Sequence, residues 1–120
     1  MAQMGEPRSG VDRLIDQVFD RFRQRFDPRR TCGEEGVFGF AVDTPEGCRH
    51  RALAVAGDTV TVSAATGPAP DAVIALDLPT LLSLATGRIT GADGYISGRI
   101  TISGDFLFAM NFSEWFGPYE

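Results

Sequence analysis

Several residue types that carry catalytic or metal-binding chemistry are scarce in this sequence of 120 residues. It has no lysine, one histidine (His50) and two cysteines, Cys32 and Cys48, which do not form a CxxC pair. A zinc ion needs three or four converging ligands, and a nucleophilic triad needs a base within hydrogen-bonding distance. The sequence therefore predicts no metal site and no cofactor. We expect His50 to be a solvated strand residue, with a catalytic base as the alternative.

Long apolar runs are also absent. No stretch of 18 apolar residues occurs, which argues against a membrane-spanning helix. The N-terminal sequence MAQMGEPRSG lacks the charged and apolar regions of a signal peptide. We therefore expect a cytoplasmic protein whose cysteines are free thiols, with a cross-strand disulfide between Cys32 and Cys48 as the alternative.

The charges are few and unevenly distributed. The net charge is −5, residues 1–30 contain seven arginines against five acidic residues, and residues 31–120 contain four arginines against eleven. A DNA-binding domain usually has a basic face, so no nucleic acid partner is expected. The length and the 43% hydrophobic content fit one folded domain. We assign a flexible N-terminus to residues 1–9 and a single domain to residues 10–120.

Hydrophobic periodicity predicts an α+β fold. Apolar residues spaced three and four apart predict an amphipathic helix over residues 11–26. Runs rich in β-branched residues predict strands over residues 36–42, 49–56, 59–63, 72–77 and 98–104. The first three strands are expected to form an antiparallel meander. Residues 88–97 show no clear period and are expected to be irregular.

Two further helices are predicted, each directly after an aspartate. Asp77 precedes LPTLLSLATG, and Asp105 precedes the very apolar segment FLFAMNFSEWF. An aspartate at this position caps a helix by accepting backbone N–H groups. The alternative interpretation is a buried general base, which would need a raised pKa.

Four segments between Gly36 and Phe112 resemble the sterol carrier protein 2 family, in the family's order. They are GVFGFAV, HRALAVAGDTVTV, PDAVIALDLPTLLSLATGRI and GYISGRITISGDFLFAM. The last resembles the family's closing signature, in which a Gly–basic–aliphatic strand is followed by Gly and a short helix containing Ala-Met. The amphipathic helix lies where the family has its first helix.

The resemblance implies a five-stranded, mainly antiparallel sheet covered on one face by helices, with an apolar tunnel between them. Family members bind sterols, fatty acids, acyl-CoA esters and phospholipids, so the resemblance implies binding and transfer of a hydrophobic small molecule inside the cell. We expect a cavity on the order of several hundred Å³. The candidate ligand-binding residues are Leu81, Leu84, Ser97, Ile100, Phe106 and Met110. Core packing is the alternative for the apolar residues, and the end of a turn is the alternative for Ser97.

Other functions are compatible with the same sequence. One is an enzyme, a cyclase or isomerase without metal, that folds a polyketide- or steroid-like intermediate in the cavity. Another is an interaction module in which Trp115, Phe116 and Tyr119 form an exposed patch for a partner or a second copy. Light-scattering analysis would then distinguish a monomer from a weak dimer.

The predicted helix at residues 11–26 also suggests a transient contact with anionic membranes. Arginines are concentrated in and just beyond it, at Arg13, Arg21, Arg23, Arg25, Arg29 and Arg30. Basic residues near an anionic surface contribute about 1 kcal/mol each. The alternative is that the apolar stripe packs on the sheet and the arginines only solvate the outer face.

Overall fold

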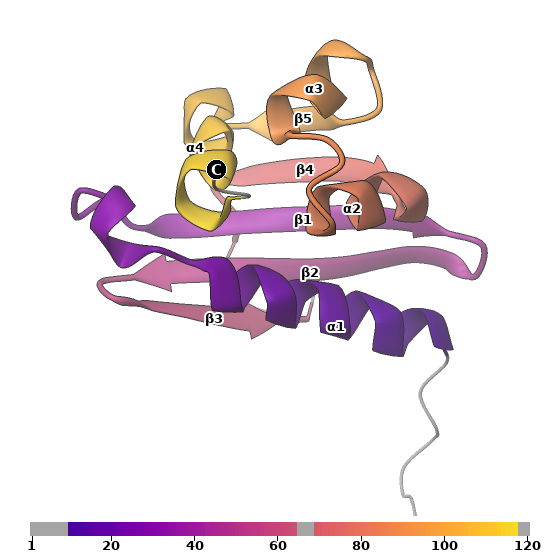
Figure 1. Cartoon of the computed structure of the whole chain (residues 1–120), viewed down its shortest axis with the longest axis horizontal. Helices are drawn as coiled ribbons and strands as arrows, with labels where there is room; N and C mark the ends of the chain where they lie inside the picture. Colours follow the sequence, from indigo (N-terminus) through magenta and orange to yellow (C-terminus); the bar gives the residue numbers. More distant parts are fainter. Residues whose placement is uncertain (1–9, 65–68, 118–120) are drawn as a thin grey trace, which may run out of the picture.

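The computed structural model describes residues 10–64 and 69–117 and contains one five-stranded sheet with its helices (Figure 1). The elements in chain order are α1 (Gly10–Arg25), η1 (Pro28–Arg30), β1 (Gly36–Thr44), β2 (Gly47–Ala56), β3 (Thr59–Ser63), β4 (Ala72–Asp77), α2 (Leu78–Ala85), α3 (Gly91–Ile96), β5 (Thr101–Gly104) and α4 (Phe106–Phe116). The α+β fold is confirmed. The N-terminus predicted to be flexible, residues 1–9, lies outside the described residues.

The sheet is mixed, with strand order β3-β2-β1-β4-β5. The predicted meander is confirmed, because β2 pairs antiparallel with β1 on one side and with β3 on the other. Strand β4 then lies parallel to β1, with Phe40 opposite Ile74, and β5 is antiparallel to β4. The chain enters β4 over the face opposite the helices, where Pro70 packs on Gly39. A Cβ atom at Gly39 would lie 2.9 Å from the Pro70 Cβ, so this position has no room for a side chain.

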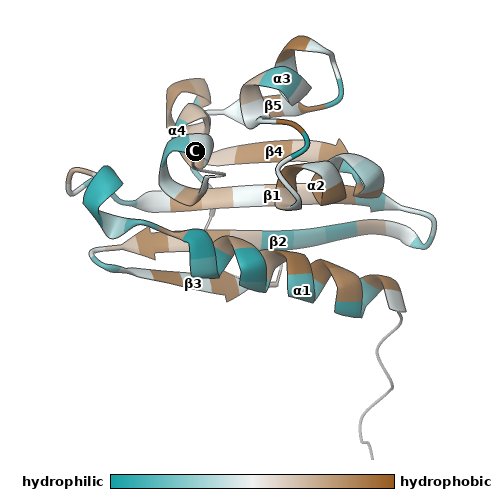
Figure 2. Ribbon diagram, viewed as in Figure 1, coloured by the Kyte–Doolittle hydropathy of each residue, from teal (hydrophilic) through white to brown (hydrophobic). Residues whose placement is uncertain are grey.

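The helices cover one face of the sheet and bury an aromatic core against it (Figure 1). Successive strand residues point to opposite faces, and Phe38 and Phe40 of β1 point towards the helices. The Phe40 ring lies 4.9 Å from that of Phe19 in α1, and the Phe38 ring lies 4.3 Å from that of Phe108 in α4. Helix α1 is amphipathic as predicted, with its hydrophilic side turned away from the sheet (Figure 2).

The segment expected to be irregular contains a helix, α3. A capping box starts it: the Thr90 side chain accepts from the Asp93 N–H, and the Asp93 carboxylate accepts from the Thr90 N–H. The helix ends at Ile96 with Ser97 as its C-cap, and Gly98 has a φ of 83°, a left-handed conformation that favours glycine. Strand β5 therefore begins at Thr101, three residues later than predicted. No helix in the described parts of the chain is long and apolar enough to cross a membrane.

Candidate functional site

An apolar pocket of about 200 Å³ lies where α2, α3 and α4 meet the β4–β5 edge of the sheet. Strand β4 contributes Ile74, β5 contributes Ile102, and Ile100 comes from the segment just before β5. Helices α2 and α4 contribute Leu84, Met110 and Phe112. The walls are therefore built by consecutive elements of the chain, from β4 to α4, and eight of the eleven lining residues have apolar side chains.

The structure brings three of the six candidate residues into this pocket, namely Leu84, Ile100 and Met110. The other three lie outside its lining. Leu81 is fully buried in the core, and the Ser97 hydroxyl donates to the Gly94 carbonyl (3.1 Å) at the end of α3. The Phe106 side chain is 39% exposed.

Two glycines of α3 bring that helix close to the pocket, and sequence reasoning did not identify them. A Cβ atom at Gly94 would lie 2.4 Å from the Ile100 Cδ1, and one at Gly91 would lie 2.9 Å from the Ser113 Oγ. The Gly91 N–H also donates to the Ser113 Oγ (3.3 Å). The signal available in the sequence was the Thr90–Asp93 capping box, which places both glycines on a helix.

Polar groups occur only at one part of the pocket lining. Ser113 and Glu114, consecutive residues of α4, are its polar side chains, and Glu114 is its one charged residue. Glu114 is exposed, whereas Met110 and Ser113 are half-buried. The pocket thus has an apolar interior and a rim that carries negative charge.

The aromatic core limits the size of the pocket. Pockets for drug-sized ligands have volumes of roughly 300–1,000 Å³, and this one is smaller. The rings of α4 and β1 fill the space beside it: the Phe112 ring lies 5.3 Å from that of Phe40, and the Trp115 ring 5.5 Å from that of Phe38. No continuous tunnel is seen among residues 10–64 and 69–117.

Asp77 and Asp105 are helix caps. The Asp77 carboxylate accepts the Thr80 N–H (2.9 Å), and Asp105 accepts the Phe108 N–H (3.0 Å). Hydrogen bonds from the side chain and backbone of Thr80 hold the pKa of Asp77 below its usual range. A general base would need a shift in the opposite direction, so the alternative interpretation of Asp77 is wrong.

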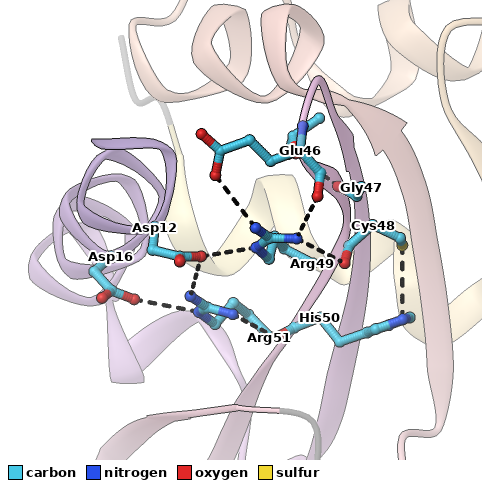
Figure 3. Close-up of polar contacts among 9 residues, drawn as sticks. Asp12, Asp16, Glu46, Gly47, Cys48, Arg49, His50 and Arg51 are labelled. Carbon is cyan, nitrogen blue, oxygen red and sulfur yellow. Dashed lines mark hydrogen bonds and ion pairs between the residues drawn. The ribbon is translucent and has the colours of Figure 1, made fainter. Parts of the chain in front are cut away.

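His50 lies on β2, and its side chain points away from the face on which Arg49 and Arg51 reach towards α1 (Figure 3). Its Nε2 is 3.6 Å from the Cys48 Sγ, and both side chains are exposed. Cys48 and Cys32 are free thiols, as predicted. His50 is therefore a solvated strand residue, and nothing in the described part of the chain groups three or more His, Cys, Asp or Glu residues as a metal site would.

The arginines in and beyond α1 mostly have partners within the protein. Arg23 pairs with Asp20, and Asp27 pairs with Arg29 (3.1 Å) and Arg30 (3.4 Å). Arg25 donates to the backbone carbonyls of Phe116 and Ala85, each at 2.8 Å. Its guanidinium therefore fastens α1 to the ends of α4 and α2.

The exposed patch expected at the end of the chain is not formed by Trp115 and Phe116. Trp115 is 2% exposed and Phe116 is fully buried. Both pack against Phe38, which explains how so apolar a helix is accommodated. Tyr119 lies outside the described residues.

Comparison with known proteins gives one family match. The model of the SCP-2 sterol transfer family matches residues 17–117. The chain is similar to sterol carrier protein 2 like 2 from Aedes aegypti, with a TM-score of 0.69, 23% identity, and coverage of 88% of this chain and 98% of that one. A palmitated form of that mosquito protein has a TM-score of 0.69, 22% identity, and coverage of 83% and 91%.

A similar fold also occurs within a larger enzyme. The sec-alkylsulfatase Pisa1 from Pseudomonas sp. has a TM-score of 0.71 and 19% identity. The match covers 88% of this chain but only 17% of the alkylsulfatase, so it shows a shared fold for one part of that enzyme. No curated protein sequence matches this chain.

Proposed function

Because this chain belongs to the SCP-2 sterol transfer family, we propose that it binds a hydrophobic small molecule and transfers it between sites, with the apolar part of the ligand held in the pocket beside α4. The family and the fold support lipid binding and transfer in general. The observation that carries the proposal is the chemistry of the walls, which are apolar at Ile74, Leu84, Ile100 and Met110.

We propose fatty acids, acyl-CoA esters, sterols and similar molecules as the ligand classes, because the pocket walls are apolar. Burying an acyl chain in an apolar site contributes about 0.8 kcal/mol per CH₂ before ordering costs are subtracted. The similar mosquito structure is described as palmitated, which supports an acyl chain as one such ligand. Met110 suits a site for varied ligands because its unbranched, polarizable side chain adapts its shape.

A ligand of this size requires the pocket to widen. The pocket holds about 200 Å³, and we propose that α3 and the start of α4 move away from β5 when the ligand enters. Strand β5 has only four residues and lies at the edge of the sheet. Short edge elements open at lower free energy than central ones.

The pocket favours a carrier over the cyclase or isomerase considered above. Such an enzyme would need a group that donates or accepts a proton beside the ligand. Among the lining residues only Glu114 carries an acidic or basic side chain, and it is exposed at the rim. The proximity effect alone remains available to an enzyme, so turnover of a candidate substrate is measured in the same experiment as binding.

The test is a titration with a fatty acid, in which the fluorescence emission of Trp115, the only tryptophan, is recorded as the signal. Phe112 lines the pocket and its ring lies 5.9 Å from that of Phe38, which in turn contacts Trp115. Ligand entry should therefore shift the emission and saturate at about one ligand per chain. Native mass spectrometry of the protein purified from cells would identify what it carries.

Met110→Asp should abolish this saturation, because an unpaired charge in an apolar cavity costs several kcal/mol. Leu107→Asp introduces the same charge on the same helix, at a residue outside the pocket lining that is 77% exposed, and should leave binding intact. Equal binding by the wild type and Met110→Asp would place the ligand elsewhere. Conversion of the bound ligand would establish an enzyme in place of a carrier.

A further inference from the structure

Four large hydrophobic side chains are exposed together on α3 and the first turn of α4. Tyr95 is 43% exposed, Ile96 82%, Phe106 39% and Leu107 77%. They are consecutive pairs on two helices, and the rings of Tyr95 and Phe106 bring the pairs together, with centroids 5.1 Å apart. We call these four residues the α3–α4 patch. The two helices that carry them lie at the β5 side of the sheet, away from α1 (Figure 1).

The patch borders the candidate pocket. Residues three and four apart share one side of a helix, so Phe106 and Leu107 are followed on their side of α4 by Met110, which lines the pocket. Helix α3 contributes Ala92 to the pocket lining, one turn before Tyr95 and Ile96. An apolar path therefore runs along both helices from the exposed patch to the pocket.

We propose that the α3–α4 patch is the surface with which this protein docks on a lipid bilayer, so that the pocket opens towards the membrane. The inference rests on the proposed function, because a carrier must receive its ligand from some lipid phase. Aliphatic and aromatic side chains enter the interfacial region of a bilayer, and tyrosine is enriched there because its ring is apolar and its hydroxyl stays hydrated. The patch has both kinds of residue.

The size of the patch favours a bilayer over a second copy of the chain. Four side chains with these exposed fractions present on the order of 400 Å². A stable protein–protein interface buries about 800 Å² on each partner. A fluid bilayer needs no complementary shape, so four inserted side chains are sufficient for a transient contact.

The charges beside the patch indicate that the contact is hydrophobic and not electrostatic. Asp93 and Asp105 are helix caps, and Arg88 before α3 and Arg99 after it are isolated exposed arginines, so the described sequence of α3, β5 and the start of α4 contains no run of basic residues. Binding should therefore occur on zwitterionic lipid and depend little on salt. A contact through the arginines of α1 would instead need anionic lipid. Helix α1 also buries its apolar stripe, including Phe19 and Phe22, against the core.

The test is co-sedimentation with phosphatidylcholine vesicles at low and high salt. The wild type should bind equally at both salt concentrations. Ile96→Asn combined with Leu107→Asn should reduce the partition coefficient by roughly tenfold or more, because two exposed aliphatic side chains are lost from the apolar contact. The matched control is Arg13→Gln combined with Arg21→Gln, two exposed positions of α1, which should bind as the wild type does.

The inference is overturned if the wild type does not bind the vesicles, or if only the arginine variant loses binding. A wild-type dimer that does not bind vesicles, and that becomes a monomer in the Ile96→Asn, Leu107→Asn variant, would assign the patch to a second copy of the chain instead. The Trp115 titration with fatty acid in the absence of vesicles separates the two proposals. The patch variant should still bind the fatty acid in solution but exchange it more slowly with vesicles. A wild type that binds vesicles but no ligand would instead contradict the proposed function.

Discussion

The Arg51 guanidinium of β2 reaches across to α1, where its Nε lies 3.2 Å from the Asp16 Oδ1 (Figure 3). The Arg51 side chain is only 10% exposed, and its Nη2 lies 3.9 Å from the Asp12 Oδ1. Arg49 donates to the same Asp12 oxygen at 2.8 Å. Two arginines on one strand thus hold two carboxylates on successive turns of α1. These contacts fix the N-terminal half of the helix, while its phenylalanines fix the other half.

Arg51→Met should lower the free energy of unfolding by roughly 1–3 kcal/mol, because it leaves a half-buried carboxylate with fewer donors. Urea denaturation would measure the change. Arg21→Met alters the same residue type on the exposed side of α1 and should stay within about 0.5 kcal/mol of the wild type. Equal effects of the two substitutions would show that the Arg51 contacts add nothing to stability.

Asp77→Ala should destabilise the protein by about 1 kcal/mol at pH 7, through loss of the α2 cap, and Asp77→Asn should cost less because asparagine also caps. The folded-state pKa of Asp77 is lowered by its hydrogen bonds to Thr80. Its charge therefore contributes stability above the unfolded pKa of about 3.9, and this contribution is lost as the pH falls through the folded pKa. The thermal unfolding midpoints of the wild type and Asp77→Asn should differ above about pH 4 and approach each other below it. A constant difference across this range would contradict the assignment.

Gly94→Ala should narrow the pocket. The new Cβ would lie 2.4 Å from the Ile100 Cδ1, so the Ile100 side chain must rotate, and Ile100 forms part of the pocket wall. Overpacking of this kind costs roughly 1–3 kcal/mol, partly offset by up to about 1 kcal/mol of helix propensity. Fatty acid affinity should fall, as measured by the Trp115 titration. Adding Ile100→Ala should restore it, whereas failure of this rescue would show that the two residues act separately.

Local chemistry determined much of the fold and could therefore be predicted from the sequence. Strands β3 and β4 have the predicted bounds because turn residues and β-branched runs delimit them. The caps at Asp77 and Asp105 follow from side chains that accept nearby N–H groups. Helix α3 was missed because it has six residues and two of them are glycine. Hydrophobic periodicity needs a longer window.

The site was predicted less well than the fold for a geometrical reason. Leu81 and Leu84 lie three residues apart on α2 and share a side of the helix, yet only Leu84 lines the pocket. Phe106 and Met110 lie four residues apart on α4 and also share a side of their helix, and only Met110 lines the pocket. Sequence spacing identifies the face that is apolar, but the neighbouring elements determine where along that face the packing leaves a space. That information lies in contacts between distant segments.

Glu114 should make the pocket discriminate against anionic head groups. It is the one charged residue of the lining, next to Ser113 at the rim, so the carboxylate of a bound fatty acid that emerges there would meet a like charge. Glu114→Gln should strengthen fatty acid binding roughly threefold, the effect of an exposed charge interaction of about 0.7 kcal/mol. It should leave the fatty alcohol of the same chain length unaffected, and added salt should reduce the difference. Asp58→Asn removes one negative charge at an exposed turn outside the pocket lining and should change neither affinity. If acid and alcohol respond equally to Glu114→Gln, the head group does not lie at this rim and the ligand enters the pocket in the opposite orientation.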